Sequence, residues 1–405
     1  MHRARWACAP VGKRSLDPFL LLCPAARESH VPITADTSRA AATARTPGID
    51  VARAIAVLGM VIVNVQGYLE AEHGPDWLLF ACERLEGRAA ALFVLLAGIG
   101  VSLRSRRARL DPAGHLRFER VALLKRAAVL YGVGLLNLHL WSWDILHCYG
   151  AYLALATLLL VARPAWLWAS AGATLVATTV LQLWVEYDAD IEQWTPLGMA
   201  AEMLYSGLYP VIPWFGFVAV GMWLGRQNLR SAAVRHRLLT VALAAAVVGE
   251  AASAWADQGF ATDALPYEVV ALLSSWPRPA TATYMVTAGG MAVACICLCI
   301  SVTERRPAAG WVVALTATGQ LAFSHYVAHA IALLIAVRHG LFDQASVTVA
   351  VVYSLVFYAG AIVVSVWWRR RWSRGPLETL VQQVTGRMEP APWGGAPLAS
   401  APRSA

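Results

Sequence analysis

The sequence predicts an all-α fold: a polytopic integral membrane bundle of about ten transmembrane helices with both termini in the cytoplasm. Hydrophobic residues make up 58% of the 405 residues and charged residues only 14%, which is too apolar for an ordinary soluble protein. Apolar runs close to the ~20 residues that cross a bilayer recur along the chain. The connections between these runs alternate in charge, as they do in multi-pass proteins.

Ten apolar runs define the predicted helices in chain order. The predicted spans are 51–69, 88–103, 122–140, 144–162, 165–186, 205–225, 238–256, 281–302, 317–338 and 346–368. The sixth contains Pro210 and Pro213 in "GLYPVIPWFGFVAVGMWLG". Because proline removes a helix donor, this run predicts a bent or broken span. Such a break indicates either a nearby cavity or a simple packing kink.

The loop charges predict the orientation of the bundle. The odd-numbered loops are acidic or uncharged on balance: "EAEHGPDW", "WSWD", "EYDADIEQW", "DQGFATDALPYE" and "HGLFDQ". The even-numbered loops and the tail "WWRRRWSR" are basic, so the positive-inside rule places them in the cytoplasm. Tryptophans are expected in two interface belts. The outer belt contains Trp77, Trp141, Trp143, Trp184 and Trp194, and the inner belt Trp367, Trp368 and Trp372.

Charge and cysteine usage argue against two classes of function. The formal net charge of +8 lies in short runs between apolar segments, so no nucleic-acid partner is predicted. Seven cysteines are scattered, and the spacing in "CICLC" spreads its thiols over different helix faces. Neither a disulfide framework nor a metal site is predicted. Residues 1–47 predict a disordered basic tail or an over-extended start, and residues 388–405 a second disordered tail.

Candidate cofactor-binding residues lie in the first span. Asp50 and Arg53 are three residues apart and share a helix face at the cytoplasmic end. They either form a structural ion pair or present the Arg53 guanidinium to the phosphates of a donor. Asn64 lies fourteen residues beyond Asp50, which is about 21 Å further across the membrane at helical rise.

Candidate catalytic residues lie at the predicted outer end. His73 stands in the first outer loop among Glu70, Glu72 and Asp76, where carboxylates can orient a general base; the alternative is an ordinary solvated histidine. A second group surrounds the turn "WSWD" and comprises His139, Asp144 and His147. These residues predict either a polar pocket with an Asp-His base or a tie between two helix ends.

Candidate substrate-pocket residues lie in "TGQLAFSHYVAHAI" of the ninth span. His325 and His329 are four residues apart on one face, and Gln320 precedes them. The HxxxH pattern lacks the glutamate of a zinc protease and an evident further ligand, so no metal is predicted. Histidines within a span usually face a bundle interior, and the three side chains therefore predict a polar cavity.

Six segments occur in an order that is similar to a known family. They are "GIDVARAIAVLGMVIVN", "GRAAALFVLLAGIGVSL", "WDILHCYGAYL", "LYPVIPWFGFVAVGMWLGR", "TGQLAFSHYVAH" and "RGPLETLVQQVTG". The order resembles the YeiB-like (domain of unknown function 418) family of bacterial membrane proteins, over residues 47 to 387. That family is related to heparan-alpha-glucosaminide N-acetyltransferase and, more distantly, to membrane acyltransferases that modify cell-surface glycans.

The resemblance implies a multi-pass protein of the bacterial cytoplasmic (inner) membrane, surrounded by membrane lipids. It implies an acyltransferase-like half at 48–235 and a YeiB-like half at 236–387. The donor would be acetyl-CoA or another acyl-CoA on the cytoplasmic side, without a metal, and the acceptor a sugar or cell-surface glycan outside. His73 occupies the region of the family's catalytic histidine, whereas Asn64 stands where more distant relatives carry a histidine. A homodimer is left open.

Two functions follow from these observations. The leading hypothesis is an acyltransferase in which Arg53 and the basic second loop (Arg104, Arg106, Arg107) attract the donor. His73, or the group around Asp144, would then deprotonate the acceptor. The alternative is a permease or exporter of a small amphipathic or lipid-linked molecule, with the polar cavity as a binding site and no covalent step.

Overall fold

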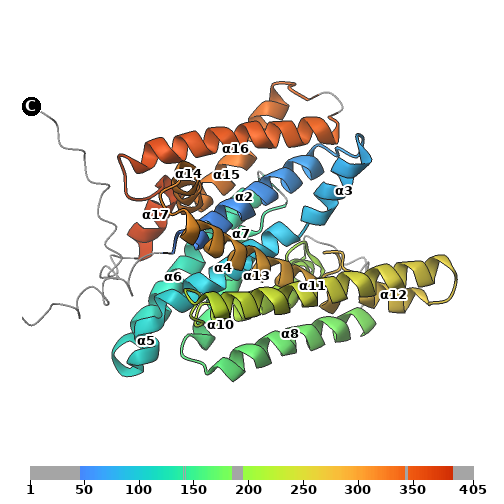
Figure 1. The fold of residues 1–405 in the computed structure, drawn as a ribbon, viewed down its shortest axis with the longest axis horizontal. Helices are drawn as coiled ribbons and strands as arrows, with labels where there is room; N and C mark the ends of the chain where they lie inside the picture. Colours follow the sequence, from blue (N-terminus) through green and yellow to red (C-terminus); the bar gives the residue numbers. More distant parts are fainter. Residues whose placement is uncertain (1–45, 140, 142, 185–194, 343–344, 386–405) are drawn as a thin grey trace, which may run out of the picture. The chain divides into compact units, whose positions relative to one another are not determined.

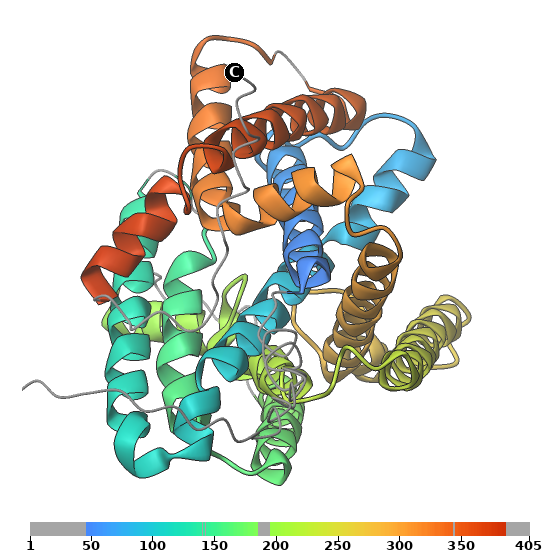
Figure 2. The same ribbon diagram turned by 60° about the vertical axis from the view of Figure 1, so that its left-hand side comes forward.

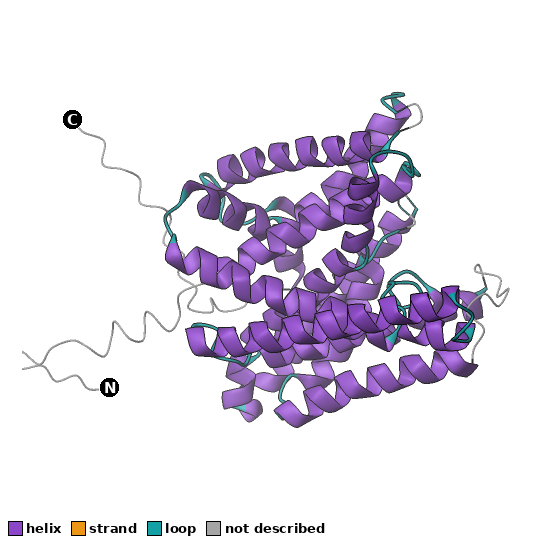
Figure 3. Cartoon of the chain, turned by 45° about the vertical axis from the view of Figure 1, so that its right-hand side comes forward, coloured by secondary structure: helices purple, strands orange, loops and turns teal. Residues whose placement is uncertain are grey.

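The computed structural model describes residues 46–139, 141, 143–184, 195–342 and 345–385. Throughout these ranges every regular element is a helix, and no strand occurs among them (Figure 3). The all-α prediction is therefore confirmed for the described chain. The predicted tails, 1–47 and 388–405, lie outside the described residues except for Thr46 and Pro47, which are the N-cap and the first residue of helix α2 (Pro47–Tyr68).

In the described part of the chain, seven helical segments are long and apolar enough to cross a membrane. They are α2 (Pro47–Tyr68), the segment Asp76–Arg104 formed by α3 (Asp76–Leu85) and α4 (Arg88–Arg104), α6 (Pro112–Leu138), α8 (Pro164–Trp184), α11 (Ala232–Ala261), α13 (Ala282–Arg305) and α16 (Val347–Arg369). Two bent helix pairs raise the number to nine among the described residues if each pair is one span. The chain is thus a multi-pass membrane protein; ten spans and cytoplasmic termini stay predictions.

Both bent pairs are informative. The first joins α9 (Pro196–Ala201) and a π-helical turn, η2 (Glu202–Ser206), to α10 (Val211–Leu224) at 44°. The bend next to Pro210 confirms the prediction from the prolines. The second joins α14 (Gly310–Gln320) to α15 (Ala322–Arg338) at 77°, where the sequence predicts one continuous span at 317–338. That prediction is wrong, because Leu321 breaks the helix.

The remaining elements are short. The predicted fourth span at 144–162 is only a short apolar helix, α7 (Leu146–Ala156), continued by the 3₁₀ turn η1 (Thr157–Leu159). Two further helices, α5 (Arg106–Leu110) and α12 (Tyr267–Leu273), lie in connections between spans, and α17 (Pro376–Thr385) follows α16. The last of these is too short to span a membrane and packs on α6 and α15.

Helix α2 lies in the interior of the bundle. It contacts α3, α4, α13, α14, α15 and α16, and Figures 1 and 2 both show it between α16 and α4. Small residues allow close packing around it: a Cβ on Gly319 would stand 1.8 Å from the carbonyl oxygen of Asp50. Since α2 contacts helices from both predicted halves of the chain, the described residues pack as one unit, and a boundary at 235/236 stays a prediction.

Candidate functional site

The outer end of α2 carries a buried polar pair. We call this end outer because the loop charges predict it to be extracytoplasmic. Asn64 on α2 and His329 on α15 are 3% and 1% exposed, and the Asn64 Nδ2 atom lies 3.0 Å from His329 Nε2. The Nδ1 atom of His329 contacts the carbonyl oxygen of Tyr326, which can only accept. We therefore assign the proton to Nδ1, so that Nε2 accepts from the Asn64 amide.

Aromatic side chains enclose this pair. Trp141 stands edge-on to the His329 ring, with 5.9 Å between centroids, and stacks on Tyr68 at 4.9 Å. The Tyr326 ring also contacts His329, with 5.1 Å between the ring centroids. Trp141 is 2% exposed, so its assignment to an interface belt is wrong. Its indole N–H is buried without a hydrogen-bond partner among the described residues. We call Asn64, Tyr68, Trp141, Tyr326 and His329 the outer cluster.

Asp144 is buried in the turn next to this cluster. Its carboxylate accepts from Asn137 Nδ2 at 2.8 Å and from the backbone N–H groups of Leu146 and His147 at 2.8 and 3.3 Å. His147 Nδ1 lies 3.6 Å from the same carboxylate, too far for a hydrogen bond. These contacts join the end of α6 to the start of α7. Of the two predicted roles, they favour a structural link between the helix ends and not an Asp-His general base.

The other two candidate histidines at this end are exposed. His73 lies in the loop between α2 and α3, and its backbone carbonyl accepts from the N–H of Val347 at the start of α16 at 2.8 Å. His139 is the exposed C-cap residue of α6. The structure therefore brings Asn64 and His329 together and leaves His73 and His139 exposed on the surface of the protein.

The inner end of α2 carries a separate group, the inner cluster of Asp50, Arg53 and Gln320. Arg53 donates to Asp50 at 2.7 Å, and the Gln320 amide donates to the second carboxylate oxygen at 3.3 Å. Asp50 is 2% exposed, whereas the Arg53 side chain is 26% exposed. The three predicted pocket residues are thus separated, because Gln320 belongs here and His329 to the outer cluster.

His325 joins neither cluster. Its Nε2 atom lies 2.6 Å from Ser365 Oγ on α16, and the Ser365 hydroxyl donates to Ala361. His325 and His329 therefore serve different partners although they share a helix face. Within the described ranges, no group of three His, Cys, Asp or Glu side chains is arranged to hold a metal ion.

Glu378 is a residue that the sequence patterns did not single out. It lies on α17, and its carboxylate accepts from the backbone N–H groups of Phe323 and Ser324 at 3.0 and 3.1 Å and from the Ser324 hydroxyl at 2.5 Å. These N–H groups belong to the first turn of α15 and lack helical partners. Glu378 therefore caps the helix that carries His329. Its place in the quoted segment "RGPLETLVQQVTG" is the only signal that could have identified it.

Two family models match the chain. The model described as heparan-alpha-glucosaminide N-acetyltransferase, catalytic, matches residues 45–254, and that of the protein of unknown function DUF418 matches residues 223–387. No curated protein matches the chain. The first match covers more than half of the 405 residues and contains Asn64, His73 and Trp141. The chain therefore belongs to the YeiB-like DUF418 family, which is related to the membrane acetyltransferase family of the heparan-alpha-glucosaminide N-acetyltransferase catalytic domain.

Proposed function

We propose that this protein moves an acetyl group from acetyl-CoA, bound from the cytoplasm, to an amine or hydroxyl of a sugar or glycan outside the bacterial inner membrane. The family membership supports acetyl transfer. The observation that carries the proposal is the buried Asn64–His329 pair at the outer end of α2, beside the unpaired indole N–H of Trp141. Polar donors at this depth in a spanning bundle indicate a site for a polar reactant.

Asn64 and Trp141 suit the stabilisation of an oxyanion. The Asn64 amide has two N–H groups, and His329 uses one of them, which fixes the orientation of the other. When the acceptor attacks the thioester carbonyl, its oxygen becomes negatively charged, and oriented N–H donors lower the energy of that state. The carbon–sulfur bond then breaks and the CoA thiolate leaves. In this proposal the second Asn64 N–H and the Trp141 N–H donate hydrogen bonds to the oxyanion.

His73 is the proposed general base for the acceptor. An attacking amine or hydroxyl must lose a proton, and an accessible histidine is the side chain that most often accepts it in enzymes. His73 is exposed and occupies the region of the family's catalytic histidine. His329 is less suited, since both of its ring nitrogens are already hydrogen-bonded. Asp144 and His147 are proposed to shape this end of the site, and His139 is the remaining candidate.

Arginines at the inner end suit the donor phosphates. Burial, together with the nearby Arg226 and Arg106, lowers the pKa of Arg109 to about 10, so the guanidinium remains charged at neutral pH in a crowded cationic group. Arg109 donates to the carbonyl of Ser102 at 2.7 Å. A bound phosphate would relieve the mutual repulsion of these cations. Arg53 can contribute as well, although Asp50 already neutralises part of its charge.

The first experiment measures acetyl-CoA binding to the full-length protein in detergent by calorimetry, with Arg109→Ala and Arg53→Ala as variants. Micromolar binding that Arg109→Ala weakens about tenfold is expected, since a charge-assisted contact is lost. Absence of binding at millimolar acetyl-CoA would overturn the donor assignment. In the same preparation, His73→Ala should lower transfer to glucosamine at least about 100-fold while binding is unchanged. Unchanged transfer would remove His73 from the mechanism.

A permease is the second candidate, and one observation favours it. The bundle contains two bent helix pairs, 197–224 and 310–338, and broken helices often line substrate sites in transporters. The two functions differ in a simple assay. An acetyltransferase hydrolyses or exchanges acetyl-CoA slowly without an acceptor, whereas a permease leaves it intact.

We also propose that the protein forms a homodimer. Cross-linking in native membranes tests this proposal, and a cross-linked species of twice the monomer mass is the expected result.

A further inference from the structure

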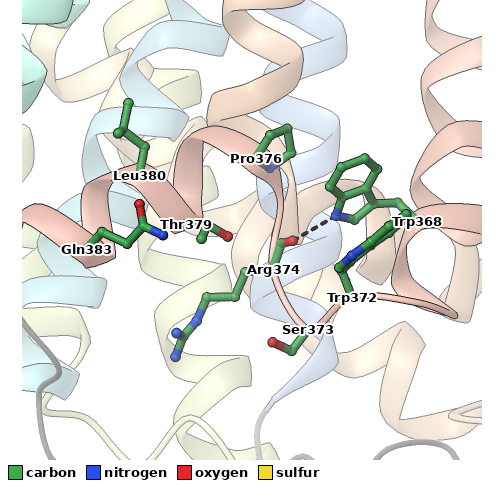
Figure 4. Close-up of a pocket in the computed structure, with 8 residues that line it drawn as sticks. All are labelled: Trp368, Trp372, Ser373, Arg374, Pro376, Thr379, Leu380 and Gln383. Atoms are coloured by element: carbon green, nitrogen blue, oxygen red, sulfur yellow. Dashed lines mark hydrogen bonds between the residues drawn. The ribbon is translucent and has the colours of Figure 1, made fainter.

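A hollow lies where α16 ends and α17 begins. It is an open hollow on the surface of the protein, with a volume of about 520 Å³. One wall is formed by Trp368 and Trp372, and the other by Pro376, Thr379, Leu380 and Gln383 of α17, as Figure 4 shows. The connecting turn supplies Ser373 and Arg374.

The shape of the hollow is fixed by contacts in its walls. The ring centroids of Trp368 and Trp372 are 4.3 Å apart. Trp368 Nε1 donates a hydrogen bond to the carbonyl oxygen of Arg374 at 2.7 Å (Figure 4). On the opposite wall, the hydroxyl of Thr379 donates to Gly375 at 2.8 Å, and Glu378 ties α17 to the first turn of α15. The hollow is therefore part of the packed bundle.

The charge of the hollow favours an anion. Four arginines occur within six residues, at 369, 370, 371 and 374, and this segment contains no carboxylate. Arg374 lines the hollow, and its guanidinium forms no hydrogen bond or ion pair with any described residue. A guanidinium of this kind recognises a phosphate through paired N–H donors. The indole rings beside it supply an apolar surface for the glycerol and upper acyl region.

The position of the hollow indicates the source of the phosphate. Arg369 ends the 23-residue span α16, so the residues that follow lie at the membrane surface. Tryptophan and arginine next to a span are typical of the headgroup layer. Clusters of basic residues directly after a span attract anionic lipids. We propose that this hollow binds the phosphate headgroup of an anionic phospholipid, with Arg374 as the phosphate contact and Trp368 and Trp372 as its apolar wall.

The test is a lipid titration of the purified full-length protein, followed by native mass spectrometry. Phosphatidylglycerol and phosphatidylcholine with identical acyl chains are the probes. The wild type should retain phosphatidylglycerol preferentially, and Arg374→Gln should weaken its binding about tenfold. Arg370→Gln, which removes the same charge outside the hollow, should change it less than about twofold, as expected for an exposed cation in screened solvent. Equal losses in both variants would overturn the site.

A second pair of variants tests the opposite wall without removing an arginine. Gln383→Glu places a carboxylate in the hollow and should repel the phosphate, whereas Gln382→Glu adds the same charge outside it. Phosphatidylglycerol should raise the Tm of the wild type and of Gln382→Glu, and not that of Gln383→Glu. An equal Tm shift in all three proteins would contradict the proposal. So would displacement of phosphatidylglycerol by coenzyme A, which would assign the hollow to a nucleotide.

Discussion

The two ends of α2 carry polar clusters that differ in how their hydrogen bonds are used. In the inner cluster, Asp50 accepts from Arg53 and from Gln320, so the buried carboxylate is paired on both oxygens. In the outer cluster, the indole N–H of Trp141 has no partner among the described residues. A buried donor without a partner costs free energy. The inner cluster therefore has the contacts of a structural group, whereas the outer cluster keeps a buried donor that the proposed function assigns to the reactant.

The sharpest test of this comparison substitutes one amide in each cluster. Asn64→Ala removes a proposed oxyanion donor and should lower kcat for acetyl transfer about 100-fold to 1,000-fold. Gln320→Ala removes an amide from the inner cluster and should change kcat less than about threefold, because the lost hydrogen bond to the Asp50 carboxylate is not part of the proposed oxyanion site. Steady-state kinetics with acetyl-CoA and glucosamine check both. Similar losses in the two variants would show that the clusters do not differ in function.

The two histidines of α15 extend the test within a single helix. His329→Ala frees the Asn64 side chain to rotate, and kcat should fall about tenfold as the oxyanion donor loses its orientation. His325→Ala removes only the contact with Ser365, so kcat should stay within about twofold while Tm falls slightly. An equal fall in kcat in His325→Ala and His329→Ala would mean that the reaction depends on the position of α15 and not on the contact between His329 and Asn64.

Most spans could be predicted from the sequence, because span length and hydropathy are local properties. The bend beside Pro210 could be predicted as well, since proline has no N–H to donate. The break at Leu321 could not. Gly319 there packs against the Asp50 backbone, and Glu378, more than fifty residues away, supplies acceptors for the freed N–H groups of Phe323 and Ser324. This break depends on tertiary contacts that no local pattern contains.

The candidate site was harder to predict for the same reason. Asn64 and His329 were each identified as polar residues within a predicted span. Their contact could not be predicted, because the two residues are 265 positions apart in the sequence. The four-residue spacing of His325 and His329 placed both on one helix face. It could not show that the first contacts Ser365 and the second Asn64. Trp141 was expected in an interface belt because tryptophan usually lies there. Its burial follows from stacking on Tyr68 and contact with His329.

A smaller effect is expected from the carboxylate of the inner cluster. Asp50→Asn leaves Arg53 without its ion pair, and the free energy of unfolding should fall by about 1 kcal/mol, since the Arg53 side chain is partly exposed and screened. Thermal unfolding in detergent should show a lower Tm, while kcat changes less than about threefold. A large fall in kcat at unchanged Tm would mean that Asp50 acts in the reaction.

The smallest effect is expected from His139→Ala, which serves as the control for His73→Ala. Both histidines are exposed at the predicted outer end. His139 caps α6, however, whereas His73 stands in the loop that follows α2, nine residues beyond Asn64. Transfer to glucosamine by His139→Ala should stay within about twofold of the wild type, because His73 is the proposed base and the exposed C-cap residue of α6 is only the alternative to it. A loss as large as that of His73→Ala would mean that the acceptor reaches the outer cluster across the turn between α6 and α7, and the base would then have to be sought beside Asp144.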